Sequence, residues 1–324
     1  MITKSPYLIF LLFVASVTGQ NNVQSRVEGT QRDQPAPVNN LLNAQSTPES
    51  DVSQSDTGAQ RPVSVNESGI SGFFGYNTKV VYRDNPTAQE TKLNELKGAV
   101  WTNTFFAGAG LGVFDMGNSI VTPYIGGSYA INDYLEDEVQ VLGLNYNSTS
   151  AYALLLAQYA NGWSARVGVT YTMDKNTETD FEDYSEYFPN IGVMKAFAVS
   201  QATTGVFDAY IGSHSSTIAT GLGIPEDNLD NIEYAASYGL ITSYGNLKLF
   251  PKYLISFKDF ENGQNVNRDD LTHNLSVKVD YPLTDSFDIS LMSIYTVRDS
   301  SGALVPSDYK NFDGGVGITL NSRF

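Results

Sequence analysis

Apolar and polar side chains alternate with a period of two residues along most of the sequence after residue 69, and this pattern most constrains the fold. A clear example sets one parity against the other: Trp163, Ala165, Val167, Val169, Tyr171 and Met173 against Ser164, Arg166, Gly168, Thr170, Thr172 and Asp174. A two-residue period is typical of a β-strand with one apolar and one polar face. The chain is therefore expected to be all-β over this region.

Polar breaks divide the alternating region into twelve expected strands, at 71–83, 96–114, 119–131, 138–159, 163–174, 187–200, 205–217, 232–243, 247–258, 270–281, 287–298 and 312–324. The fourth is too long for a simple span. Every second connection is short, whereas the intervening ones, at 84–95, 132–137, 175–186, 218–231, 259–269 and 299–311, are mostly longer and polar. An even strand count with short turns at one end and long loops at the other predicts a transmembrane antiparallel β-barrel.

The apolar parity would fill the interior of a soluble barrel, but it would face lipid around a membrane barrel. The polar parity carries Arg and Lys beside Ser and Thr, which a wet lumen allows. Aromatic residues also gather beside the short turns, as in a girdle at the headgroup level: Phe114, Tyr159, Trp163, Tyr244, Tyr281, Phe287 and Phe324. Both observations favour the membrane.

The final stretch, GGVGITLNSRF, continues the alternation, with an apolar parity of Val316, Ile318, Leu320 and Phe324 that only Ser322 breaks. A closed barrel has no free edge, so its last strand must pair with its first. The stretch resembles the C-terminal closing strand of Gram-negative outer-membrane barrels. The resemblance implies that these four residues form an assembly signal read by the barrel-assembly machinery, and that the protein resides in the outer membrane beside lipid and lipopolysaccharide.

The first 68 residues differ in character from the rest. Lys4 followed by the apolar run YLIFLLFVAS predicts a cleaved secretory signal peptide over 1–19, in preference to a buried core helix. Residues 20–68 are rich in Gln, Asn, Ser, Thr and Pro and show no period, which predicts a disordered periplasmic linker, with a partner-binding tail as the alternative. The barrel itself is expected over 69–324.

The absence of cysteine excludes thiolate catalysis, cysteine-ligated zinc and iron–sulfur clusters. Only two histidines are present, and no phosphate-binding or dinucleotide motif occurs, so no metal site and no cofactor are expected. The net charge of −16 argues against nucleic acid as a partner. Acidic residues concentrate in the long loops, where YLEDEV and DKNTETDFEDYSEY predict a negative outer mouth.

Basic residues fall instead on the polar parity of the strands. The expected pore lining is Arg166, Lys195, Lys248, Lys252 and Lys278, with Asp208 neutralising part of it. Lys195 is included although the parity of its strand is ambiguous. Asp280 is also placed to neutralise this stripe, so a preference for anions stays open.

The sequence favours a narrow passive, porin-like channel for small solutes, with anions as the candidate class and no catalytic residues. One alternative is a closed barrel with a role in surface adhesion or envelope structure. A lipid hydrolase is the third, since His214 and Ser216 share a face and Asn228 follows, a set similar to that of outer-membrane phospholipase A. The sequence does not indicate an oligomeric state.

Overall fold

The computed structural model describes residues 70–86, 88, 97–137, 144–178, 180–219, 225–302 and 308–324. The expected signal peptide (1–19) and linker (20–68) lie outside these residues. Within them the strands are β1 (Ser71–Arg83), β2 (Gly98–Gly110), β3 (Phe114–Asp115), β4 (Ser119–Tyr134), β5 (Tyr146–Tyr159), β6 (Trp163–Asn176), β7 (Glu182–Ser200), β8 (Thr203–Ile218), β9 (Asn231–Tyr244), β10 (Leu247–Phe260), β11 (Asp269–Thr284), β12 (Phe287–Ser301) and β13 (Tyr309–Arg323). A short 3₁₀ helix, η2, covers Gly263–Asn265.

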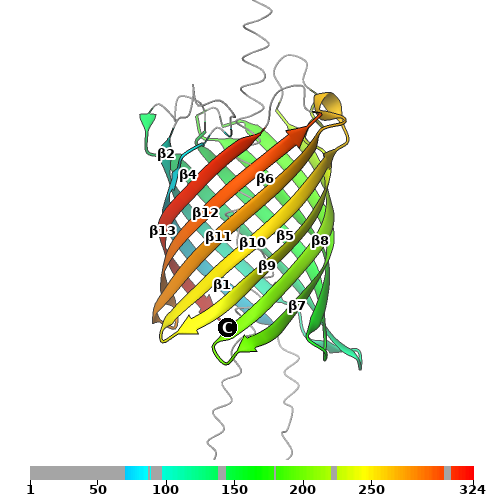
Figure 1. Ribbon diagram of the computed structural model, residues 1–324, viewed down its shortest axis with the longest axis vertical. Coiled ribbons are helices and arrows are strands. Elements are labelled where there is room, and N and C mark those ends of the chain that lie inside the picture. Colours follow the sequence, from blue (N-terminus) through cyan, green and yellow to red (C-terminus); the bar gives the residue numbers. More distant parts are fainter. Residues whose placement is uncertain are drawn as a thin grey trace, which may run out of the picture.

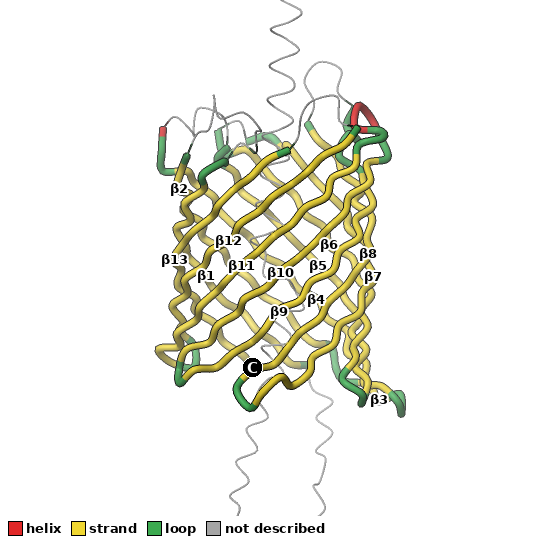
Figure 2. The backbone as a smooth tube through the Cα atoms, in the orientation of Figure 1, coloured by secondary structure: helices red, strands yellow, loops and turns green. Residues whose placement is uncertain are grey.

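The strands form a closed antiparallel barrel (Figure 1). β1 pairs with β2 on one side and with β13 on the other, and β2 continues to β4, so the described long strands make an uninterrupted ring of twelve. The two-residue β3 pairs only with the start of β4, at the tip that projects from one end in Figure 2. The predicted twelve-strand barrel is confirmed.

Closure depends on the last residues of the chain. Val80 of β1 is paired with Val316 of β13, and Gly72, near the start of β1, exchanges two backbone hydrogen bonds of 2.8 and 3.0 Å with Phe324, just after β13. A Cβ atom added to Gly72 would lie 2.3 Å from the Phe324 ring, so the ring covers this glycine. Glycine is required at this position because the closing aromatic ring occupies the space of a side chain.

Two predicted boundaries are wrong. The fourth strand was expected over 138–159, but β5 begins at Tyr146, and residues 138–143 lie outside the described part of the chain. The loop expected over 175–186 is shorter, because β6 reaches Asn176 and β7 already starts at Glu182. Polar side chains suit both a solvated loop and a wet barrel interior, so composition did not distinguish the two.

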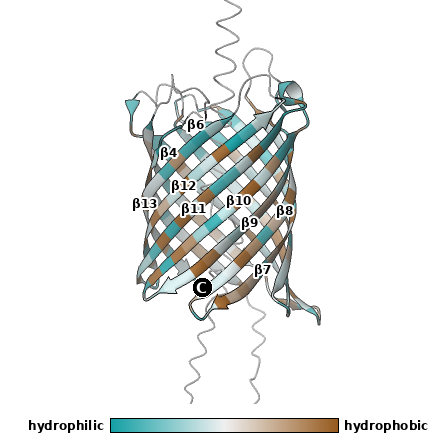
Figure 3. Cartoon of the chain, viewed as in Figure 1, coloured by the Kyte–Doolittle hydropathy of each residue, from teal (hydrophilic) through white to brown (hydrophobic). Residues whose placement is uncertain are grey.

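The outer face of the ring is apolar. Val167 of β6, Leu275 of β11 and Val316 of β13 are each about half exposed, while their sequence neighbours point inward. Colouring by hydropathy shows hydrophilic and hydrophobic residues intermixed along each strand, as this alternation requires (Figure 3). None of the described helical segments is long and apolar enough to cross a membrane.

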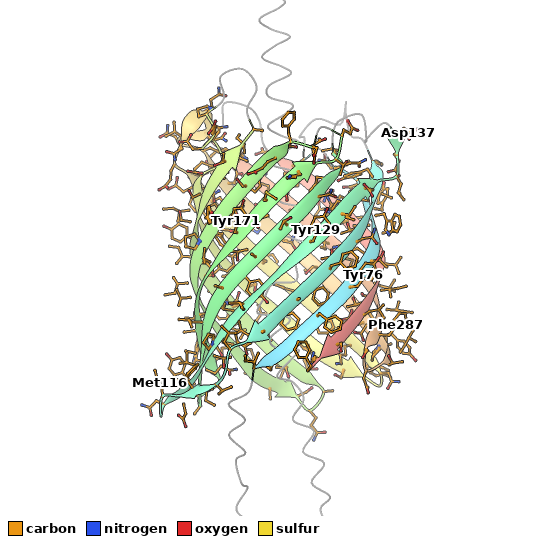
Figure 4. All side chains as sticks on the ribbon, turned by 180° about the vertical axis from the view of Figure 1, so that it is seen from behind. Tyr76, Met116, Tyr129, Asp137, Tyr171 and Phe287 are labelled. Carbon is orange, nitrogen blue, oxygen red and sulfur yellow. The ribbon has the colours of Figure 1, made fainter. Side chains whose placement is uncertain are left out.

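Exposed aromatic residues gather near both ends of the barrel. Trp163, Tyr159 and Phe324 mark the short-turn end, as predicted from the sequence. The structure adds a second group toward the long loops, where the exposed Tyr129 and the half-buried Tyr171 lie in Figure 4, the latter against the exposed Tyr187. An apolar band between two aromatic belts is the surface of a membrane-spanning barrel. The chain has the architecture of an outer-membrane β-barrel.

The closing contact gives a first prediction. Replacing Phe324 with Ala uncovers Gly72, and we expect the free energy of unfolding to fall by about 1–2 kcal/mol, since a point change that removes packing typically costs this much. Gly72→Val should have a similar effect, because its side chain displaces the ring. Urea unfolding in phospholipid vesicles measures both, with the exposed Ser322→Ala as the control. Equal urea midpoints for Phe324→Ala and Ser322→Ala would contradict the role of the ring.

Candidate functional site

The lumen is lined by the inward-facing, polar side chains of the strands, and many of these side chains lie against the barrel wall. Arg166 of β6 is the best example. Its guanidinium reaches across β7 to Asp208 of β8, with Nη2 and Oδ2 3.1 Å apart and a second contact through Nη1. Only a glycine, Gly192, lies between the two strands at this point, and a Cβ there would be 2.8 Å from Arg166 Cζ. The missing side chain therefore makes room for the ion pair.

Lys252 of β10 extends this row of charges. Its stem lies beside Gly239 of β9, with Lys252 Cβ 3.5 Å from where a glycine Cβ would stand. The charges of Asp208 and Arg166 act on its ammonium group. Arg166, Asp208 and Lys252, which we call the charged arc, thus follow the inner wall from β6 to β10. The charged arc contains two bases and one acid, so it carries one positive charge in excess.

A second group of charges lies nearer the short turns and is balanced. Lys278 donates to Asp280 at 2.8 Å, and Lys248 stands directly across the strand pair from Asp280. Asp288 lies within electrostatic range of all three. Two bases and two acids cancel. Among the basic residues that were predicted to line the pore, Lys252 is therefore the one whose positive charge is not balanced by an acid.

Lys195 is not part of the lining, and this prediction is wrong. It is paired directly with the outward-facing Trp163, and its ammonium group lies 5.1 Å from the centre of the Trp163 ring. Directly paired residues of an antiparallel ladder project to the same side. Lys195 thus lies on the outer surface beside the aromatic belt, where a long basic side chain reaches the headgroups while its stem stays in apolar surroundings.

A buried charged group toward the long-loop end was not expected from the sequence. His214 Nδ1 lies 2.8 Å from Glu186 of β7 and His214 Nε2 lies 3.0 Å from Glu233 of β9, while the His214 ring stacks on Phe188 at 4.1 Å between centroids. An imidazole donates to two acceptors only when both nitrogens carry protons, so this bridge suits a cationic His214. Parity alone places the three residues in the lumen, but their pairing across three strands needs the register.

Other charges near the same end are paired as well. Asp270 accepts two hydrogen bonds from Arg268, at 2.8 and 2.6 Å, and Arg298 approaches it to 3.8 Å. Arg83 of β1 lies 3.8 Å from Asp313 of β13. All of these side chains are almost fully buried. This end of the lumen is therefore lined by an interlocked layer of ion pairs.

The hydrolase set is not assembled. Both nitrogens of His214 are occupied by carboxylates, and the Ser216 hydroxyl donates to Asp230 at 2.9 Å instead. Asn228 accepts hydrogen bonds from the backbone amides of Gln264 and Asn265 in η2. Asp230 thus holds Ser216 within β8, and the two amides hold Asn228 in the β8–β9 connection.

Aromatic rings in the lumen also lie against glycines. A Cβ at Gly75 would be 2.3 Å from the Phe106 ring, and one at Gly108 would be 2.6 Å from the Phe73 ring. Tyr152 covers Gly126 in the same way. Each ring is held along the wall rather than across the lumen, which keeps its bulk away from the barrel axis.

No family model matches the sequence, and no curated protein matches it. Among solved structures, the chain is similar to an outer-membrane channel from Pseudomonas putida F1 (10% identity, 82% of this chain and 99% of that one, TM-score 0.47). It is also similar to the NanC porin (8%, 76% and 98%, TM-score 0.44) and to the translocator domain of the autotransporter NalP from Neisseria meningitidis (10%, 79% and 90%, TM-score 0.41). At these levels the similarity carries no argument about function, and the barrel assignment stands on the closed ladder and the apolar outer face.

The contacts between inward-facing rings and strand glycines give a second prediction. Gly75→Ala should lower the free energy of unfolding by about 1–3 kcal/mol, because the added methyl group overlaps the Phe106 ring and overpacking costs this much. Gly239→Ala is the matched control, since its nearest neighbour would be a carbonyl oxygen at 3.2 Å. Urea unfolding in vesicles compares the two variants. A control as unstable as Gly75→Ala would show that strand glycines matter for backbone reasons alone.

Proposed function

We propose that this barrel is a passive outer-membrane channel for small solutes with a preference for anions. The observation that supports it is the charged arc: one surplus cation, Lys252, in a polar lumen whose largest side chains lie along the wall. A fixed charge in a narrow passage raises the local concentration of counter-ions, because low-dielectric walls focus its field. No catalytic role is part of this proposal.

The proposal includes the route to the membrane. Residues 1–19 act as a cleaved signal peptide, residues 20–68 form a periplasmic linker, and residues 69–324 are inserted by the barrel-assembly machinery through the segment that holds Val316, Ile318, Leu320 and Phe324. Outward-facing Lys195 and the acidic loops then contact lipid headgroups and lipopolysaccharide.

One observation favours a second candidate. The ion pairs at the long-loop end, around His214 and Asp270, are almost fully buried. A layer of this kind suits a closed barrel whose acidic loops serve adhesion or envelope structure. The two candidates differ in one measurable property, which is whether ions cross the lumen.

Single-channel recording of the full-length chain in planar bilayers, with a tenfold KCl gradient, tests the proposal. Stable current steps with a reversal potential shifted toward the chloride equilibrium would support it. A folded barrel that inserts but passes no current would overturn the channel and leave the closed barrel with a surface role.

Charge variants give a third prediction. Lys252→Gln should lower the chloride-to-potassium permeability ratio by about two- to fivefold, since a unit charge in water acts on a nearby ion with about 1 kcal/mol. The double variant Lys278→Gln/Asp280→Asn should change the ratio less, because it removes one base and one acid of the balanced group together. Reversal potentials measure both ratios. An equal effect of Lys252→Gln and of the double variant would show that the surplus charge of the arc has no special role.

A further inference from the structure

The lumen wall opposite the charged arc is aromatic. Phe73, Phe106, Tyr124 and Tyr152 project inward from β1, β2, β4 and β5, which are neighbours in the ring, and we call these four residues the aromatic wall. The Phe73 and Phe106 rings are 6.3 Å apart and rest on glycines. Tyr124 packs with Leu154, Leu156 and Met194.

The strand order sets the two surfaces against each other. In the ring of twelve long strands, β8 lies six strands from β1, and β10 lies six strands from β4. Strands half a ring apart face each other across a barrel. Asp208 of the charged arc is therefore opposite Phe73, and Lys252 is opposite Tyr124.

The two surfaces also share one level of the barrel. Arg166 and Asp208 lie in the halves of their strands next to the short turns, as do Phe73, Phe106 and Tyr124. Lys252 and Tyr152 lie near the middle of theirs. A solute at this level meets a positive charge on one side and aromatic faces on the other.

These surfaces differ in how firmly they are built. Arg166 is held by its pair with Asp208, whereas Lys252 forms no ion pair within the described part of the chain. The rings of the aromatic wall are held against glycines of neighbouring strands. The free ammonium group of Lys252 is thus available to a passing anion while the wall opposite stays in place.

We propose that the preferred solutes of the channel are small carboxylates with an apolar, ring-sized body. This inference rests on the proposed channel function. The carboxylate pairs with Lys252 and approaches the Arg166 guanidinium, and the body lies against the aromatic wall, where its removal from water is favourable. A carboxylate whose body is covered with hydroxyl groups gains less from the second contact, because the faces of Phe73 and Phe106 offer its hydroxyl groups no hydrogen-bond partners in exchange for water.

Two carboxylates of similar ring size test this selectivity. Benzoate has an apolar ring and quinate carries hydroxyl groups on a six-membered ring. We expect full-length protein in planar bilayers to show a permeability for benzoate, relative to chloride, about tenfold above that for quinate. Block of the KCl current by benzoate but not by quinate also supports the site. Equal permeability without selective block overturns the inference.

Variants assign the selectivity to the two surfaces. Phe106→Ser should reduce the benzoate-to-quinate ratio to about one to three. Phe250→Ser, which removes an inward-facing ring beside Lys278 on the other wall, is the matched control and should leave the ratio unchanged. Lys252→Gln should lower both carboxylate permeabilities together and preserve their ratio. A ratio unaffected by Phe106→Ser, or equally affected by Phe250→Ser, contradicts the aromatic wall.

The outcome separates this inference from the proposed function. If the protein shows KCl current steps but equal permeabilities for benzoate and quinate, the solute preference is wrong and the channel function stands. A folded, inserted barrel without KCl steps removes the proposed function itself. The wild-type comparison decides the inference even if Phe106→Ser does not fold, and heat-modifiable electrophoretic mobility reports folding for every variant.

Discussion

The pairing of β13 with β1 closes the barrel. Within a bilayer an unpaired strand edge leaves its amide and carbonyl groups without partners, and only closure of the ladder removes both edges. The register from Phe73 with Arg323 up to Arg83 with Asp313 fixes how far β13 slides along β1. That choice of register then determines which side chains lie side by side on the lumen wall, including Arg83 and Asp313 themselves.

Closure also explains the distribution of glycine. A ring of tilted strands leaves limited space on its inner face, and several bulky inward side chains lie beside a glycine of a neighbouring strand. Phe106 lies over Gly75 and Arg166 lies over Gly192, so an apolar and a charged side chain both use the space beside a glycine. Phe324 over Gly72 repeats this arrangement on the outer face at the closing seam. Glycine in these strands is thus a packing partner of a large side chain.

Most charged side chains in the lumen are paired with oppositely charged side chains of the protein itself. Asp208, Asp280 and Asp270 each contact a base, and His214 is held between two acids. Net charge or a count of basic residues is therefore a poor guide to what the lumen attracts. What matters is the charge left over after pairing, and Lys252, which forms no ion pair among the residues that the structure describes, places part of it on the wall opposite the aromatic rings.

The alternation along the chain was enough to predict the twelve strands, the antiparallel barrel and the face that meets lipid, because a two-residue period fixes which side chains share a side. It was also enough to assign Arg166, Asp208, Lys248, Lys252 and Lys278 to the inner parity. The folded barrel was needed to show which of these charges cancel, that Lys195 lies outside, and that His214 contacts Glu186 and Glu233 and not Ser216. Those outcomes depend on the register between strands and on which strands stand half a ring apart. Contacts across a barrel join residues far apart in sequence, and no local pattern encodes them.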